Sequence, residues 1–514
     1  MKWVIINGET TTIEDIVNVA RHGYQVKISE DAIKKIQRAR DFVDKLVDQG
    51  KVVYGITTGF GEFSKVSISK EQAEDLQRNL IISHSCGVGN HFPEEVVRAI
   101  MVLRVNALAK GFSGIRLETI NGLVEMLNKG VYPAIPEKGS LGASGDLAPL
   151  SHMVLPLIGE GEAYYQGKLM GGAEAMKEAG ITPVRLTSKE GLALINGTQV
   201  MTAVGLLTAY DAMQFAKLCD ISASMTIEAL NGITDAFMPE LHEIRPHAGQ
   251  ICTAENLLRI LAGSERTSHQ GELRVQDAYA LRCLPQIHGA SKDAIQFVLD
   301  KVAIEVNAVT DNPIILVDKE MAVSGGNFHG QPVALAFDFL GIAIAELANI
   351  SERRIERLVN PALSNGLPAF LTEKGGLHSG FMIAQYAAAA LVSENKVLAH
   401  PASVDSIPSS GNQEDHVSMG TIAARKAKEM LFNLSRVIAI ELFAAAQGLD
   451  LNSRERGYQM GQGTEIAYKK VRSVVPVVKD DRVMYTEFEK VARLVQDHSI
   501  VKEVEKVIGE LKLN

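Results

Sequence analysis

The glycine-rich loop from Gly139 to Ser151 has the greatest chemical potential in the chain, because it contains the triplet Ala143-Ser144-Gly145. If the fold compresses this triplet, the Gly145 nitrogen can attack the Ala143 carbonyl carbon, and loss of water closes a five-membered ring. Ser144 can then eliminate its hydroxyl group as a second water, which leaves a methylidene group on the ring. Glycine suits this reaction because its nitrogen is unhindered and its backbone adopts torsions that other residues avoid. The triplet therefore predicts a strong electrophile made from the chain itself.

The same loop also fits a simpler interpretation, a glycine-rich turn before a helix in which Ser144 or Asp146 is the N-cap residue. Taken alone, Gly-Ala-Ser-Gly-Asp is at least as typical of such a turn as of ring formation. The sequence has no G-x-G-x-x-G after a strand, no phosphate-binding loop and no G-x-S-x-G nucleophile elbow. His242 and His247 are a poor metal-binding pair, since Pro246 lies between them and keeps them off one helix face. We therefore expect no metal and no nucleotide cofactor.

A second group of candidate residues, Gln276, Tyr279 and Arg282, is spaced by three residues along the chain. This spacing predicts that the three side chains lie on one face of a helix. Arginine is the natural partner of a substrate carboxylate, because its planar guanidinium can bind both oxygens. An arginine in an ion pair at a surface or an interface is the alternative that the spacing alone leaves open.

Further motifs accompany the loop along the chain: YGITTGFG at 54–61, LQRNL at 76–80, LINGT at 194–198, TDNP at 310–313 and GNFHGQP at 326–332. With them the chain resembles the family of ammonia-lyases and aminomutases that carry a 4-methylidene-imidazol-5-one group. The resemblance covers nearly the whole chain. It implies that Ala143, Ser144 and Gly145 form this group autocatalytically, without metal or nucleotide. It also implies a homotetramer whose active sites are each assembled from three subunits.

The resemblance assigns roles to residues outside the triplet. Tyr54 is the leading candidate for the catalytic base, and Tyr279 is the second candidate. A tyrosine base needs a lowered pKa, and therefore a positive potential nearby. Arg282 is expected to bind the substrate carboxylate. The remaining matches line the substrate and the prosthetic group: Asn196, Gln276, Tyr279 and Phe328.

Two places along the chain concern the choice of substrate. His84 follows Ser83, a pair that resembles members acting on histidine and excludes phenylalanine better than tyrosine. Glu414 lies in the segment QEDH at 413–416, where members acting on other aromatic substrates have a neutral amide. A carboxylate can accept a hydrogen bond from an imidazole N–H, whereas a phenyl ring offers no donor. We expect L-histidine as the substrate, converted by non-oxidative elimination of ammonia to trans-urocanate.

Several alternatives stay open at this point. Glu414 could instead cap a helix or pair with an arginine. Thr57 and the segment at 62–65 depart from the members acting on histidine and lean toward the aminomutases. A tyrosine ammonia-lyase or a tyrosine 2,3-aminomutase is therefore the alternative function, and the electrophile could engage either the amine or the ring of the substrate. A non-catalytic structural or binding protein is disfavoured, because it would not need the triplet, Tyr54 and Arg282.

The elements that must position these residues are mostly helices. The first half mixes an opening strand, an amphipathic helix at 31–49 capped by Ser29, and a hairpin at 162–170. The second half contains alanine- and leucine-rich helical segments near 198–230, 290–308, 332–359, 380–398 and 421–447. We predict a mainly α fold, with a long central helical bundle and a smaller N-terminal globular domain. The expected boundary separates residues 1–195, which carry the Tyr54 and Ala143-Ser144-Gly145 loops, from the long-helix bundle and C-terminal helices of 196–514.

Composition limits the possible partners and the location of the protein. The 514 residues carry a formal charge of −9 with interleaved signs and only 5% aromatic residues, which argues against nucleic acid and acidic lipid surfaces. The long uncharged stretches at 191–210 and 375–393 contain polar residues, so they suit helices buried in protein and not in a membrane. Four widely separated cysteines and no secretory signal favour the cytoplasm. Several helices are apolar nearly all round, which favours a homotetramer with shared active sites.

Overall fold

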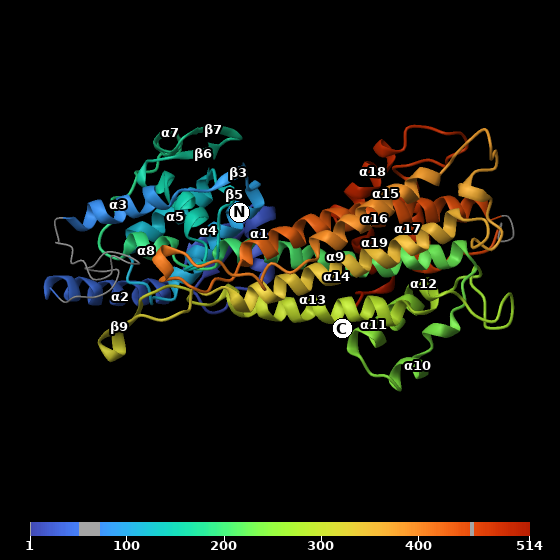
Figure 1. Cartoon of the computed structure of the whole chain (residues 1–514), viewed down its shortest axis with the longest axis horizontal. Helices are drawn as coiled ribbons and strands as arrows, with labels where there is room; N and C mark the ends of the chain where they lie inside the picture. Colours follow the sequence, from blue (N-terminus) through green and yellow to red (C-terminus); the bar gives the residue numbers. More distant parts are fainter. Residues whose placement is uncertain (1, 51–71, 453–456, 514) are drawn as a thin grey trace. The chain divides into compact units, whose positions relative to one another are not determined.

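The computed structural model describes residues 2–50, 72–452 and 457–513, which form two compact units. The first unit comprises residues 1–207, 300–337 and 401–425, and the second comprises 208–299, 338–400 and 426–514. The boundary near residue 195 stays a prediction; the compact units divide the chain at 207/208 and assign two later stretches to the first unit. Tyr54, Thr57 and the segment at 62–65 lie outside the described residues. Figure 1 shows the helices and strands of the chain in order.

The first unit begins with β1 (Trp3–Ile6), which pairs in parallel with β2 (Gln25–Ile28) on either side of α1 (Ile13–His22). Helix α2 (Glu30–Asp48) follows, and the Ser29 hydroxyl accepts a hydrogen bond from the Ala32 N–H at its start. The opening strand and the capped helix are therefore confirmed. The apolar face of α2 packs on β8 (Ile314–Leu316), which pairs with β9 (Met321–Val323).

Short strands and helices make up the rest of the first unit. Strand β3 (Val88–His91) pairs with β5 (Pro136–Lys138), and β6 (Glu162–Tyr165) lies between β4 (Val131–Pro133) and β7 (Lys168–Gly171). Gln166 and Gly167 both have positive φ at the β6–β7 turn, so the predicted hairpin is confirmed with the backbone that its tight turn requires. The helices of this region are α3 (Ala73–His84), α4 (Glu94–Ala109), α5 (Leu117–Lys129), α6 (Leu147–Val154), α7 (Gly172–Glu178) and α8 (Glu190–Ile195).

Long helices dominate the remainder of the chain, which confirms the mainly α fold. Four of them contribute residues to both units: α9 (Gln199–Ala229), α13 (Leu284–Val306), α14 (Gln331–Val359) and α16 (Gly420–Leu451). The other helices of the second unit are α10 (Pro239–Glu243), α11 (Ala248–Ile260), α12 (Tyr279–Arg282), α15 (Met382–Leu398), α17 (Gln462–Arg472), α18 (Tyr485–Gln496) and α19 (Ser499–Ile508). Among the described helices only α14 is long and apolar enough to cross a membrane, and 67% of its most apolar window is buried inside the protein.

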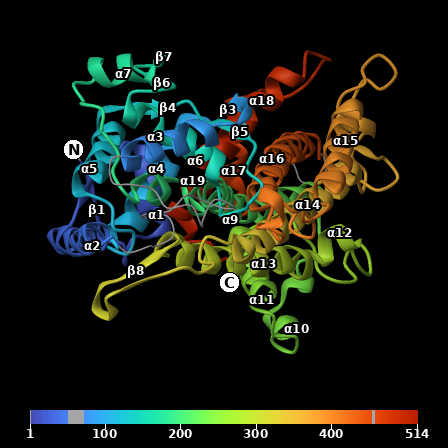
Figure 2. The ribbon, with the colours of Figure 1, turned by 60° about the vertical axis from the view of Figure 1, so that its left-hand side comes forward.

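Buried ionic contacts join the long helices within the second unit, where Figure 1 and Figure 2 show them side by side. Glu441 of α16 receives hydrogen bonds from Ser222 and Thr226 of α9 and from Ser351 and Arg354 of α14. The side chains of Arg354 and Glu441 are fully buried. Because a buried charge without its partner is costly, this cluster favours one alignment of the three helices.

We predict that Glu441→Ala destabilises the protein strongly, because it leaves the Arg354 guanidinium buried without a counter-charge. Removing one partner of a buried pair costs about 3–5 kcal/mol, which should lower the midpoint of thermal unfolding measured by calorimetry. Glu429→Ala is the matched control, since Glu429 is exposed on the same helix. Its effect should stay within about 0.5 kcal/mol. Equal midpoints for the two variants would contradict the role given to Glu441.

Candidate active site

The Ala143-Ser144-Gly145 triplet forms a tight turn in the first unit. Ser144 has a positive φ of 54°, and the flanking Gly142 and Gly145 have φ of 85° and 77°. A non-glycine residue in this region of backbone space is uncommon, and such strain concentrates at functional sites. The Gly197 N–H donates to the Ser144 carbonyl at 3.3 Å. The backbone is thus strained at Ser144, which lies between the two residues that ring formation would join.

Close backbone contacts on both sides leave no room for side chains at the two glycines. A Cβ atom on Gly145 would lie 2.1 Å from the Gly197 carbonyl oxygen, and a Cβ on Gly142 would lie 2.3 Å from the Ser418 hydroxyl. The Met419 N–H also donates to the Leu141 carbonyl at 3.2 Å. Segments far apart in the sequence therefore hold the loop from two sides.

Asp146 anchors the loop to the start of α9. It occupies the N-cap position of α6, as the turn interpretation predicts, but its side chain makes no capping hydrogen bond there. Instead, its buried carboxylate accepts from the Val200 and Met201 N–H groups at 3.0 and 2.8 Å, and from the Ser140 and Thr421 hydroxyls. Burial raises the pKa of Asp146, and these four donors oppose that rise. The turn is therefore more than a local cap, since one side chain connects three segments of the unit.

Arg104 of α4 holds the segment on the other side of the loop. Its buried guanidinium donates to the carbonyls of Ala193 and Asn196 and to the side-chain oxygen of Gln199, the last two at 2.9 and 2.6 Å. Burial lowers the pKa of Arg104 to about 10, and the charge of Asp311 opposes this shift. Sequence reasoning missed Arg104, although a lone arginine in the apolar run MVLRVNALA at 101–109 was a usable signal.

Asn196 lies between Arg104 and the TDNP segment. Its amide nitrogen donates to the Asn312 carbonyl at 3.0 Å, whereas its buried Oδ1 has no hydrogen-bond partner among the described residues. Asp311 is itself held by a buried ion pair with Lys189 at 2.7 Å. Buried acceptors rarely stay unpaired, so the free Asn196 oxygen next to the triplet marks a place for a donor from a bound group.

His84 and Glu414 are brought together in the first unit. His84 ends α3, and its Nδ1 lies 3.1 Å from the Ser83 hydroxyl. Burial lowers the pKa of His84, while the charge of Glu414 is close enough to raise it. Glu414 lies in a loop, where its backbone exchanges hydrogen bonds with Ser409. It neither caps a described helix nor forms an ion pair with a described lysine or arginine.

Phe328 lies on a half-buried turn that is linked to the Glu414 loop through two histidines. The rings of His329 and His416 stack with centroids 5.5 Å apart and an angle of 26°. The His329 Nε2 lies 3.3 Å from the His416 carbonyl. The Phe328 turn and the segment that contains Glu414 therefore lie side by side.

The remaining predicted residues belong to the second unit, and the helix predicted for them is wrong at Gln276. Helix α12 begins only at Tyr279, and Gln276 lies in the irregular segment before it. The reason is Asp277, whose carboxylate accepts from the Ile233 N–H and from Arg274, both at 2.6 Å. These tertiary contacts override the helical spacing. Within α12 the Arg282 guanidinium lies 4.6 Å from the exposed Tyr279 ring, and its Nε donates to the Asp277 carbonyl.

Metal ligands do not cluster in the part of the chain that the structure describes, where no three His, Cys, Asp or Glu side chains could hold one ion. His242 uses its two ring nitrogens for hydrogen bonds with the Ala236 carbonyl at 3.1 Å and the Gln250 amide at 3.0 Å.

We predict that Arg104→Met lowers the midpoint of thermal unfolding by several degrees. The change leaves three buried oxygens without a donor, and each unsatisfied group costs about 1–3 kcal/mol. Arg78→Met is the control, because Arg78 is an exposed arginine paired with Glu160 and should be nearly neutral. Differential scanning calorimetry of both variants tests this, and an unchanged midpoint for Arg104→Met would show that the contacts are dispensable.

Comparison with known proteins identifies the family to which the chain belongs. The model of the aromatic amino acid lyase family matches residues 11–473. A histidine ammonia-lyase of Alkaliphilus oremlandii is 66% identical over 508 residues, which cover 99% of each chain. The solved histidine ammonia-lyase from Trypanosoma cruzi has a TM-score of 0.91 at 44% identity, covering 98% of this chain and 95% of that one. Tyrosine aminomutase from Streptomyces globisporus has a TM-score of 0.95 at 40% identity, covering 99% and 100%. The chain therefore belongs to the aromatic amino acid lyase family.

Proposed function

We propose that this protein eliminates ammonia from L-histidine without oxidation and releases trans-urocanate. The observation that carries the proposal is the Glu414 carboxylate beside His84, in the same unit as the strained triplet. An imidazole N–H can donate to this carboxylate, whereas a phenyl ring has no donor. The names of relatives agree, since the Alkaliphilus oremlandii protein is a histidine ammonia-lyase.

The proposed prosthetic group is a 4-methylidene-imidazol-5-one, formed autocatalytically from Ala143, Ser144 and Gly145. The residues around the triplet fit it: Ser144 already has a strained backbone, Gly145 packs directly on Gly197, and the buried Asn196 oxygen receives no donor from the residues that the structure describes. Asn196 and the Gly197 backbone would hold the group. When formed, it supplies an electrophile that accepts electrons from the substrate, which no ordinary side chain can do.

The chain's own residues then bind the substrate and handle its protons. Arg282 is oriented by its bond to the Asp277 carbonyl, and its fork can bind both oxygens of the substrate carboxylate. Glu414 accepts the imidazole N–H, with His84 beside it. Tyr54 takes the β-proton, and Tyr279 is the second candidate for this base. Gln276 and Phe328 line the substrate.

A shared active site is part of this proposal. The predicted residues are divided between the two units of the chain, and large apolar side chains are exposed on the long helices and on α15, among them Phe297, Phe339, Ile342, Tyr386 and Phe432. Such surfaces are typical of obligate interfaces. We propose a homotetramer with active sites shared between subunits, located in the cytoplasm, with no nucleic-acid or membrane partner.

A tyrosine ammonia-lyase or tyrosine 2,3-aminomutase is the second candidate. The observation that favours it is the likeness to the Streptomyces globisporus tyrosine aminomutase, with a TM-score of 0.95. Glu414 does not separate this candidate from the first, because a tyrosine hydroxyl can also donate to a carboxylate. The products formed from histidine and from tyrosine separate the two.

We predict that the peptide containing residues 139–151 has a mass two waters below that of its sequence, when freshly purified protein is measured by mass spectrometry. Ser144→Ala should keep the unfolding midpoint of the parent protein, lose the second of these dehydrations and lose nearly all activity, since alanine has no leaving oxygen. A peptide of unmodified mass in active protein would exclude the proposed prosthetic group.

We predict that Glu414→Gln lowers kcat/KM for histidine by about ten- to a hundredfold, the value of a hydrogen bond to a charged group. The measurement compares kcat/KM for histidine, tyrosine and phenylalanine between the parent protein and the variant, with product formation followed by ultraviolet spectroscopy. Asp415→Asn is the control, because Asp415 is an exposed acid next in the sequence.

The specificity experiment separates the two candidate functions. A parent protein that prefers tyrosine, or that forms a β-amino acid, would favour the second candidate. Full histidine activity in Glu414→Gln would contradict the role of Glu414 in substrate recognition, but not the proposed reaction.

A further inference from the structure

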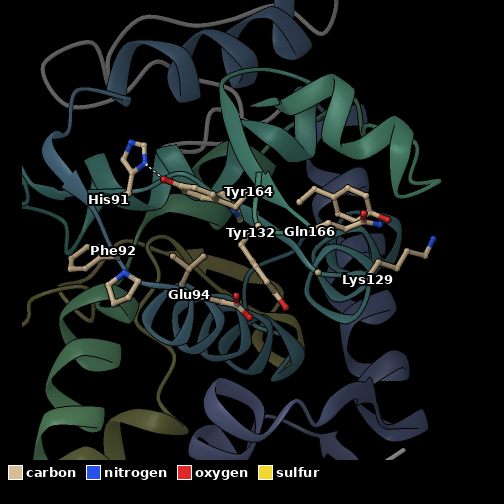
Figure 3. A pocket seen from close by; sticks show the side chains of 13 residues that line it. His91, Phe92, Glu94, Lys129, Tyr132, Tyr164 and Gln166 are labelled. Atoms are coloured by element: carbon tan, nitrogen blue, oxygen red, sulfur yellow. Dashed lines mark hydrogen bonds between the residues drawn. The ribbon is translucent and has the colours of Figure 1, made fainter. Parts of the chain in front are cut away.

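The first unit contains a cavity of about 510 Å³ that none of the candidate active-site residues lines. It lies between β3, the start of α4, the end of α5, β4 and the β6–β7 hairpin (Figure 3). This volume is in the range of pockets that hold small molecules. The cavity is therefore large enough for a ligand of its own.

Aromatic side chains form its walls. Tyr164 on β6 is held by His91, whose Nδ1 lies 3.0 Å from the Tyr164 hydroxyl, with the two rings edge to face at 77°. Tyr132 on β4 is held from behind by Arg98, which donates to its hydroxyl. Phe92 is buried at the base of the wall. These contacts restrain the rings, so a ligand can pack against them with little loss of side-chain entropy. The Arg98 guanidinium lies 5.3 Å from the centre of the Tyr132 ring.

Two charged side chains line the cavity, Glu94 and Lys129, and they form no ion pair with each other. Lys129 is engaged elsewhere, because its ammonium donates to Glu125 at 2.9 Å and to the Gly180 carbonyl at 3.1 Å; Figure 3 shows it pointing away from Tyr132. Glu94 forms no ion pair with any residue that the structure describes. Burial raises the pKa of Tyr132, and the charge of Glu94 adds to this rise while Arg98 opposes it. The Glu94 carboxylate therefore lies at the Tyr132 hydroxyl, with which it shares a hydrogen bond, and Arg98 donates to the same hydroxyl.

We propose that this cavity binds a small organic cation that carries an aromatic ring. Its charged group would lie at Glu94, and its ring would pack against Tyr132 and Tyr164. A cation gains both from the carboxylate and from the faces of the aromatic rings. An anion of the same shape would be repelled by Glu94 and would find Lys129 already paired. The site is separate from the proposed catalytic function and does not depend on it.

The test is a binding titration of the full protein with 2-phenylethylamine, followed by saturation-transfer NMR. The matched anion, 3-phenylpropionate, has a similar body and the opposite charge. We expect saturable millimolar binding of the amine and weaker binding of the acid. Glu94→Gln should raise the dissociation constant of the amine about two- to fivefold, as expected for a partly exposed charge contact.

Glu95→Gln is the matched control, because Glu95 is the next residue on α4 but pairs with Arg21 at 2.7 Å and does not line the cavity. The affinity of the Glu95→Gln variant for the amine should equal that of the parent protein. Tyr164→Leu removes an aromatic ring from the other side of the cavity and should also weaken binding of the amine. This second variant keeps the test valid if Glu94→Gln folds poorly. Equal affinities in the Glu94 and Glu95 variants, tighter binding of the acid, or no saturable amine binding would overturn the proposal.

Discussion

The direct backbone contact between Gly145 and Gly197 is the constraint on which the candidate active site depends. Two loops can approach this closely only if neither carries a side chain, since a Cβ on Gly145 would overlap the Gly197 carbonyl. Asp146 adds the second attachment, because its carboxylate accepts from the first N–H groups of α9. Contacts with these neighbouring segments therefore stabilise the strained backbone conformation of Ser144.

Buried charges supply the rigidity around this contact. Arg104 and the Lys189–Asp311 pair lie beside the triplet, and the Arg354–Glu441 pair joins helices in the second unit. Taking these groups out of water is costly, so each is stable only when all its partners are in place. A network of this kind contributes less to total stability than apolar packing would, but it penalises any shift of one segment against another. That precision suits a site whose chemistry depends on backbone atoms.

The proposed substrate choice rests on a weaker and more local arrangement. Glu414 lies on a loop and acts on His84 through its charge, while burial disfavours protonation of the same ring. A site with one carboxylate and one largely neutral imidazole can distinguish a ring that donates a hydrogen bond from one that does not. Changes in these two positions would alter specificity without disturbing the triplet or its anchors.

The sequence by itself determined the local features: the capped helix α2, the Gln166-Gly167 hairpin and the long apolar helices. It also supplied the proposal of ring formation at Ala143-Ser144-Gly145. Periodicity, caps and turn residues encode the local features through neighbours in the chain. Only the tertiary structure decided which buried polar groups meet, since Arg104 finds Asn196 across 92 residues. It also overruled spacing at Gln276, because Asp277 bonds to distant groups that no local pattern reveals. Long-range pairing depends on which helices pack together, and that outcome is a property of the whole fold.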